Sequence, residues 1–449
     1  MARLPRLSAV VSADAAGEFR LRSVAVAAYG PSTLFGVCQG SMLPVITLSA
    51  IHLGASTSIA AFIAALLGIG SIVTNIPAGI LATRAGERKS MLVAAALTIA
   101  GLACCLAAAG RGTAALAMFG LGVLIMGCAS SVYLLARQAY LTEMVPPPMR
   151  ARALSTLGGT MRVGVFAGPF LGAGAERLWG LSGAYYVSIA AMAAAALIVV
   201  RVPDLEMSDE HRQAAAQVTS RVILKRYWRV FVTLGTGIVL LSAIRQTRQV
   251  VIPLWGAHIG LSPADNSVIY GVAGAIDALI FYPAGKVMDV YGRRWVAVPC
   301  VLIMGVSFLL MPLTHGAVTL ALTAMLMGFG NGIGSGIVMT FGADISPSAG
   351  RPTFLGIWRE LADAGSGIGP VVLSAVTGIA GLAAGIIVSG AVGFAAAAAL
   401  WVWTPKNPGA RDREPEPDEV APGVSAETPH AIASDVSAET RYGHAPQGQ

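Results

Sequence analysis

Long apolar runs, each interrupted by a short polar stretch, make up most of the chain from residue 24 to residue 404. A helix needs about 20 mostly apolar residues to cross the roughly 30 Å hydrocarbon core of a bilayer. Twelve runs are long enough, and they predict helices at 24–50, 57–82, 90–109, 114–140, 153–176, 183–202, 229–257, 265–288, 295–313, 317–342, 354–378 and 380–404. The pattern therefore predicts an all-α membrane protein with 12 transmembrane helices.

The polar segments divide the chain into five parts. We expect an N-terminal segment (1–22), a six-helix bundle (23–202), a charged central loop (203–228), a second six-helix bundle (229–404) and a tail (405–449). The tail is rich in Pro, Glu, Asp and Ser and is expected to be disordered, because it has too few bulky apolar residues to form a core. Residues 1–22 lack the apolar stretch of a cleavable signal peptide.

Composition and charge agree with a membrane protein. Charged residues make up only 12% of the chain, against roughly 25% in soluble domains. Of the 30 Lys and Arg residues, 23 lie on the side of the membrane that holds both termini, whereas only Arg111 and Arg177 lie on the other side. The positive-inside rule therefore predicts a multi-pass protein of the cell membrane with both termini cytoplasmic. This placement also argues against nucleic acid as a partner.

No catalytic or cofactor-binding pattern stands out. The cysteines all lie in apolar runs without metal-ligand spacing, so we expect small buried side chains and no metal. The sequence shows no Ser/His/Asp arrangement, and the glycine-rich stretch around Asn331 follows no predicted strand, which argues against a phosphate-binding loop. We therefore expect no enzyme activity and no cofactor.

The two halves of the chain repeat each other. Residues 77–88 align with residues 283–294 at an offset of 206, with Pro, Ala, two Gly and the final Arg identical. Further along, Gly168-Pro169 aligns with Gly369-Pro370 at an offset of 201. The repeat predicts two six-helix bundles in the same orientation, related by an axis along the membrane normal.

The repeated motifs resemble those of a known family. Gly79-x-Leu-Ala-Thr-Arg-x-Gly-x-Arg-Lys89 and its copy at 285–294 resemble the loop motif of the major facilitator superfamily. The stretch Gly164-x-x-x-Gly168-Pro169-x-x-Gly172 resembles a motif of its 12-helix drug:proton antiporters. The resemblance implies the major facilitator fold, with two pseudo-symmetric six-helix bundles and alternating access. It also implies roles as gating-loop or hinge residues for Gly79, Arg84, Gly86, Arg88, Gly285, Asp289, Gly292, Arg293, Gly168, Pro169, Gly369 and Pro370.

The chain departs from that family in several places, of which two bear most on the mechanism. Thr83 stands where the first loop motif usually has Asp, and the first helix has no acidic residue. Coupling residues therefore cannot be transferred from relatives. In the second motif, we interpret Asp289 as a latch that accepts backbone N–H groups of the fifth helix, with topology-setting charge as the alternative. The Gly-Pro pair is either a swivel or a site of close helix packing.

Ionisable residues inside the apolar runs are the main site candidates, because burying a charge in lipid is costly unless it is paired or hydrated. Arg162 and Asp277 each lie about ten residues from the cytoplasmic end of their helices, hence ~15 Å deep. Helices five and eight pack together in the family. We hypothesise an Arg162–Asp277 ion pair that opens or is protonated during transport; the alternative is a permanent structural pair.

Two more helices carry embedded charges. Arg359 and Asp363 have the i,i+4 spacing of an intrahelical pair, which leaves Glu360 as a second candidate proton carrier. Arg245 and Arg248 share a face that suits a carboxylate or phosphate of the substrate. Alternatively, they meet Glu360 and Asp363 or act as intracellular gate charges. The predicted substrate cavity comprises Gln39, Arg137, Gln138, Arg245, Gln246, Arg248, Gln249 and Asn331.

The sequence thus predicts a proton-coupled secondary transporter that exports small organic molecules or drugs. Five embedded arginines against three acids favour an anionic or amphipathic substrate. The alternatives are an importer or facilitator of a small metabolite and a non-transporting receptor or scaffold. The expected partners are the lipid bilayer, a small-molecule substrate and protons, with the monomer as the functional unit.

Overall fold

The computed structural model describes residues 25–108, 110, 112–145, 150–201, 220–334, 336–347 and 351–404, and within these ranges all regular elements are helices. The predicted N-terminal segment, most of the predicted central loop and the predicted disordered tail lie outside the described residues. Those three predictions therefore stay predictions.

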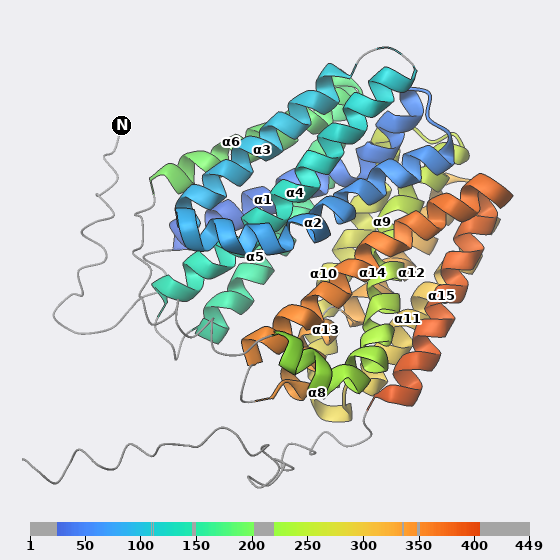
Figure 1. Ribbon diagram of the computed structural model, residues 1–449. Helices are drawn as coiled ribbons and strands as arrows, with labels where there is room; N and C mark the ends of the chain where they lie inside the picture. Colours follow the sequence, from blue (N-terminus) through green and yellow to red (C-terminus); the bar gives the residue numbers. More distant parts are fainter. Residues whose placement is uncertain are drawn as a thin grey trace, which may run out of the picture. The chain divides into compact units, whose positions relative to one another are not determined.

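Fourteen α-helices follow one another along the described chain. The first half contains α1 (Ala25–His52), α2 (Thr57–Ala85), α3 (Glu87–Ala107), α4 (Thr113–Met144), α5 (Arg150–Trp179) and α6 (Ser182–Val200). The second half contains α8 (Ser220–Val232), α9 (Leu234–His258), α10 (Pro263–Tyr291), α11 (Arg294–Leu310), α12 (Ala317–Ile333), α13 (Ile337–Ile345), α14 (Arg351–Ala380) and α15 (Leu382–Trp403). Figure 1 shows α1–α6 in blue to green and α8–α15 in yellow-green to red.

Most of these helices can cross a bilayer. Among the described residues, nine spans are long and apolar enough, and α8 with α9, bent by 67°, forms a tenth. α5 and α10 have the length of a span, 30 and 29 residues, but each carries charged side chains at its centre or ends. With α5 and α10 counted by length, the described helices fit the twelve-span arrangement predicted from the sequence.

The backbone repeats from one half to the other. Glycines with positive φ end helices at matched positions: Gly54 matches Gly260 and Gly86 matches Gly292, both at the first offset of the sequence repeat. Gly180 matches Gly381 at the second offset. We call the end of the bundles with Gly54 the distal end and the end with Gly86, where α1 starts and α15 stops, the terminal end.

The Gly-Pro motifs lie where two helices pack very closely. A Cβ atom on Gly164 of α5 would lie less than 3.0 Å from the carbonyl oxygen of Thr33 on α1, and a Cβ on Gly365 of α14 would meet Val239 on α9 in the same way. Thr33 and Val239 are themselves repeat mates at the first offset. The glycines of both motifs therefore serve close helix packing, within helices that continue past Pro169 and Pro370.

Two elements differ from the sequence prediction. The helix predicted over 317–342 is interrupted between Ile333 and Ile337, because glycine weakens a helix and the Cys300 side chain occupies the space beside Gly334. The last part of the segment predicted as a central loop is helical, since it forms the start of α8.

The halves meet through a few helix pairs. α2 packs against α14, α5 against α10, and α1 against α9 and α10. Near the distal end, Ser58 of α2 and Ser374 of α14 each donate a hydrogen bond to the other's backbone carbonyl, at 2.7 and 2.8 Å. These pairs place the candidate site between the halves.

Candidate functional site

Asp277 of α10 is the centre of the first polar cluster. Its Oδ2 accepts a hydrogen bond from Nδ2 of Asn331 on α12 at 2.6 Å and lies 3.5 Å from Nη2 of Arg248 on α9. Arg162 of α5 interacts electrostatically with Asp277 and with Arg245. The carboxylate therefore joins three helices of the second half and faces a cation of the first half.

Asn75 of α2 is the centre of a second cluster, which connects the halves directly. Its Nδ2 donates to Oδ2 of Asp363 on α14 at 2.8 Å, and its Oδ1 accepts from Ser131 of α4. Asn75 also hydrogen-bonds Glu360. One amide of the first half thus holds both acids of α14.

The charged residue Arg359 lies beside this second cluster. Its Nε is 3.9 Å from Oδ2 of Asp363, one helical turn away, and its side chain is 53% exposed. Asp363 and Arg162 occupy the same position counted from the first residues of their helices, Arg351 and Arg150. Acidic and basic groups therefore occur at matching depths in the two halves.

Several buried arginine N–H groups have no acceptor among the residues that the structure describes. Nε of Arg137, Nε and Nη2 of Arg245, and Nε of Arg248 are buried and have no hydrogen-bond partner among the described residues. Buried donors of this kind are costly unless they find an acceptor. The buried guanidinium N–H groups without acceptors among the described residues thus come from both halves, from α4 and from α9.

Most of the other residues predicted to line the substrate cavity make hydrogen bonds to side chains of their own half. Nη1 of Arg137 donates to Ser32 of α1 at 2.8 Å, and Gln39 of α1 donates to Ser130 of α4 at 3.0 Å. Nε2 of Gln246 lies 3.4 Å from Oε1 of Gln249 on α9. Gln138 is exposed on α4.

The predicted gating loops occur at the terminal end. Gly86 and Gly292 adopt φ values of 84° and 92°, where only glycine is unstrained. Arg88 donates to the carbonyl oxygens of Val199 and Val200 at the end of α6. Its repeat mate Arg294 lies 3.6 Å above the ring of Trp401 near the end of α15. Each arginine thus ties a loop to the last helix of its own half.

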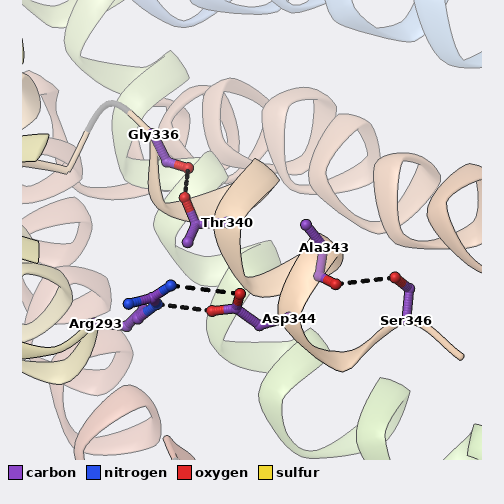
Figure 2. Close-up of polar contacts among 6 residues, drawn as sticks. All are labelled: Arg293, Gly336, Thr340, Ala343, Asp344 and Ser346. Atoms are coloured by element: carbon purple, nitrogen blue, oxygen red, sulfur yellow. Dashed lines mark hydrogen bonds and ion pairs between the residues drawn. The ribbon is translucent and has the colours of Figure 1, made fainter. Parts of the chain in front are cut away.

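Arg293 makes the best-defined ion pair of these loops. Its Nε donates to Oδ2 of Asp344, in the last turn of α13, at 2.7 Å and its Nη2 to Oδ1 at 3.4 Å (Figure 2). The same figure shows Thr340 donating to the Gly336 carbonyl at the start of this helix. This carboxylate belongs to the same half as Arg293. The side chains of Arg84 and Asp289, and residues Gly79 and Gly285, have no described surroundings, so the latch assigned to Asp289 stays a prediction.

Sequence reasoning missed two polar residues between the halves. Asn75 has no charge and was therefore not selected as a candidate. An amide within an apolar run nevertheless indicates a hydrogen-bond partner on a neighbouring helix. Glu176, near the distal end of α5, was placed at the helix boundary by the run predicted over 153–176. It is buried, with only 5% exposed, and Ser267 of α10 donates to its Oε1 at 2.8 Å.

Comparison with known proteins identifies what the chain resembles. The family model described as Major Facilitator Superfamily matches residues 30–276 and 235–435. No curated protein matches the sequence. Among solved structures, a D-xylose–proton symporter is similar with a TM-score of 0.68 and 16% identity, over 86% of this chain and 98% of that chain.

Two further structures are similar to the same extent. The nucleoside transporter NupG has a TM-score of 0.65 and 15% identity, over 84% of this chain and 98% of its own. A bacterial homolog of the human lysosomal transporter Spinster, in an inward-facing and unoccupied conformation, has a TM-score of 0.69 and 13% identity, over 86% and 97%. At such identities the likeness shows the fold.

Proposed function

Because the chain belongs to the Major Facilitator Superfamily and is thus a membrane transporter rather than an enzyme, we propose that it is a proton-coupled exporter of small organic anions or amphipathic molecules. The observation that carries this proposal is the set of buried arginine N–H groups without acceptors among the described residues, on Arg137, Arg245 and Arg248. These groups come from α4 of the first half and α9 of the second. A carboxylate, sulfonate or phosphate between the halves would supply the missing acceptors.

Proton coupling is supported by the acids at the same depth. Asp277 lies between Arg248 and Asn331, whereas Asp363 is held by Asn75 across the halves. Protonating Asp277 would release Arg248, and protonating Asp363 would change its bond to Asn75. The first event alters contacts within the second half, beside Arg162 of the first, and the second event alters a hydrogen bond between the halves. Coupling a proton to a conformational change requires contacts of this kind.

The proposed direction of transport and the proposed orientation of the protein in the membrane both rest on the sequence. The Gly-Pro motif of α5 resembles that of drug:proton antiporters, and the distribution of Lys and Arg favours a cytoplasmic terminal end in the cell membrane. We propose that the monomer is the working unit, because both clusters lie within one chain.

The decisive experiment uses the full chain in liposomes with an imposed pH gradient and a pH-sensitive dye inside. Organic anions, cations and neutral sugars of similar size are tested in turn. We expect anions to move against the proton gradient, with dye fluorescence reporting counter-movement of protons. Movement of cations alone, or flux that ignores the pH gradient, contradicts the proposal; co-movement of substrate and protons identifies an importer instead.

Arg245→Gln tests the anion site in the same liposomes. Removing the guanidinium, whose Nε and Nη2 lack partners among the described residues, is expected to raise the KM for the anion at least about tenfold, the equivalent of one charge-assisted hydrogen bond. Lys in its place should recover part of the affinity, since it restores charge without the planar donor pair. Arg359→Gln, at the more exposed pair, serves as the control. A KM unchanged by Arg245→Gln removes this residue from the site.

Deleting residues 406–449 distinguishes a transporter from a receptor or scaffold. A transporter should keep its flux after the deletion, because the proposed site lies within α1–α15. Loss of all flux, with the remaining chain still folded, favours a role in which the tail is essential.

A further inference from the structure

The distal end of α5 holds a carboxylate that the proposed central site does not use. Glu176 is 5% exposed, and the Ser267 side chain that donates to it is completely buried. The other carboxylate oxygen, Oε2, has no hydrogen-bond partner among the described residues. A carboxyl group this deeply buried with a single donor is far cheaper to accommodate neutral than ionised.

Glu176 lies where the halves must separate at the distal end. It belongs to α5 of the first half and Ser267 belongs to α10 of the second. Toward the middle of the same contact, Gly271 of α10 faces Phe170 and Pro169 of α5 so closely that a Cβ atom would lie 3.0 to 3.2 Å from them. The α5–α10 contact is therefore tightly packed at Gly271, and Glu176 and Ser267 further along it are themselves buried.

The described residues place no buried cation against this carboxylate. From α6, Tyr185 interacts electrostatically with Glu176, and its hydroxyl donates to Ser49 of α1 at 2.9 Å. The remaining acidic and basic groups described at the distal end are exposed: Arg177 of α5, His52 of α1, His258 of α9, Asp265 of α10 and His315 before α12. The distal part of α4 carries no ionisable residue among those described.

We propose that Glu176 is a second proton-binding site, which is loaded when the distal contact between α5 and α10 opens and which must hold its proton for that contact to close. With a proton bound, the neutral carboxyl group packs against Ser267. Once the proton leaves, the charged carboxylate disfavours the dry interface, and the halves separate at the distal end. The site is separate from the Asp277 and Asn75 clusters, and it deepens the proposed proton coupling.

The test measures distal opening without substrate or transport. Spin labels are attached at Ile59 of α2 and Ile379 of α14, which are exposed at the distal end of opposite halves, in the full chain with its native cysteines replaced. Pulsed electron resonance gives the distance distribution in liposomes between pH 5 and pH 9. We expect the ratio of long to short distances to rise about tenfold or more with pH, because ionisation of Glu176 favours the open contact.

The variants make the result specific. Glu176→Gln keeps the shape and a hydrogen-bonding oxygen but cannot ionise, so the short distances should persist at all pH values. Glu176→Leu, which removes the polar group, should behave in the same way. Asp265→Asn, near Ser267 on α10 but exposed, is the matched control and should keep the wild-type response.

Each other outcome overturns the inference. A wild-type distance ratio that does not change with pH contradicts it, as does a full pH response in Glu176→Gln. Failure of Glu176→Gln to fold at pH 5 also contradicts it, because a protonated carboxyl group and an amide have nearly the same shape. If liposome transport ignores the pH gradient while the Glu176-dependent opening is observed, the proposed function fails and this inference stands.

Discussion

Asp277→Asn is expected to destabilise the protein by about 3 kcal/mol or more, because it leaves a buried guanidinium without its counter-ion. Arg248 has a side chain only 9% exposed and lies 3.5 Å from the carboxylate. Removing Asp277 and Arg248 together should cost less than removing Asp277 alone, since the buried guanidinium of Arg248 then no longer stands without its counter-ion. The measurement is the thermal stability of the purified variants in one detergent, compared pairwise.

The same series decides which arginine is the main partner. Asp277→Asn combined with Arg248→Gln should recover more stability than Asp277→Asn combined with Arg162→Gln, because Arg248 lies 3.5 Å from Asp277 with a side chain only 9% exposed and is therefore costly to leave charged alone. The opposite ranking supports the pair across the halves that was hypothesised from the sequence. Arg359→Gln is the control: its 53% exposed side chain predicts a change within about 1 kcal/mol.

The architecture was predictable because its signals are local or periodic. Apolar runs of spanning length mark the helices, and the two offsets of the sequence repeat reappear as the matched positive-φ glycines Gly54 and Gly260, Gly86 and Gly292, and Gly180 and Gly381. Depth in the membrane was also readable, since Arg162 and Asp363 occupy equivalent positions along α5 and α14. Position along a helix gives depth directly.

Which way a side chain faces was much harder to predict. Depth alone put Arg162 and Asp277 at one level, but the contact of Asp277 with Arg248 depends on helix rotation and packing, which a single sequence does not encode. Asn75 and Glu176 were missed for a related reason. The amide of Asn75 and the carboxyl group of Glu176, which is near a helix end, have no distinctive sequence pattern. Their importance follows from the opposing helices, which place Asp363 against Asn75 and Ser267 against Glu176.

The glycine-rich run at 317–342 was predictable in part. Its composition gave a signal, because closely spaced glycines favour both tight packing and a weak helix. The structure has both features: Gly328 and Gly332 pack against the backbone of α10, and the helix is interrupted after Ile333. The interruption lies shortly after Asn331, which binds Asp277.

Gly164→Ala should be the most damaging single-methyl change in the first half. Its Cβ would overlap the Thr33 carbonyl oxygen, and the obstacle is backbone, so α1 and α5 must move apart along their whole contact. Overpacking of this kind costs about 1–3 kcal/mol where side chains can adjust, and more where they cannot. We expect a folded yield reduced severalfold, measured as the monodisperse peak in gel filtration, and a lower melting temperature.

The repeat provides both a replicate and matched controls for this change. Gly365→Ala, against the Val239 carbonyl, should be equally damaging, because the α9–α14 contact reproduces the α1–α5 contact. Gly159 on α5 and Gly356 on α14 have no neighbouring atoms within 4 Å of an added Cβ, so alanine there should be neutral or slightly stabilising through helix propensity. If Gly164→Ala folds as well as Gly159→Ala, α1 and α5 are not in backbone contact. Damage confined to one half would mean that the two bundles differ in packing despite their shared motif.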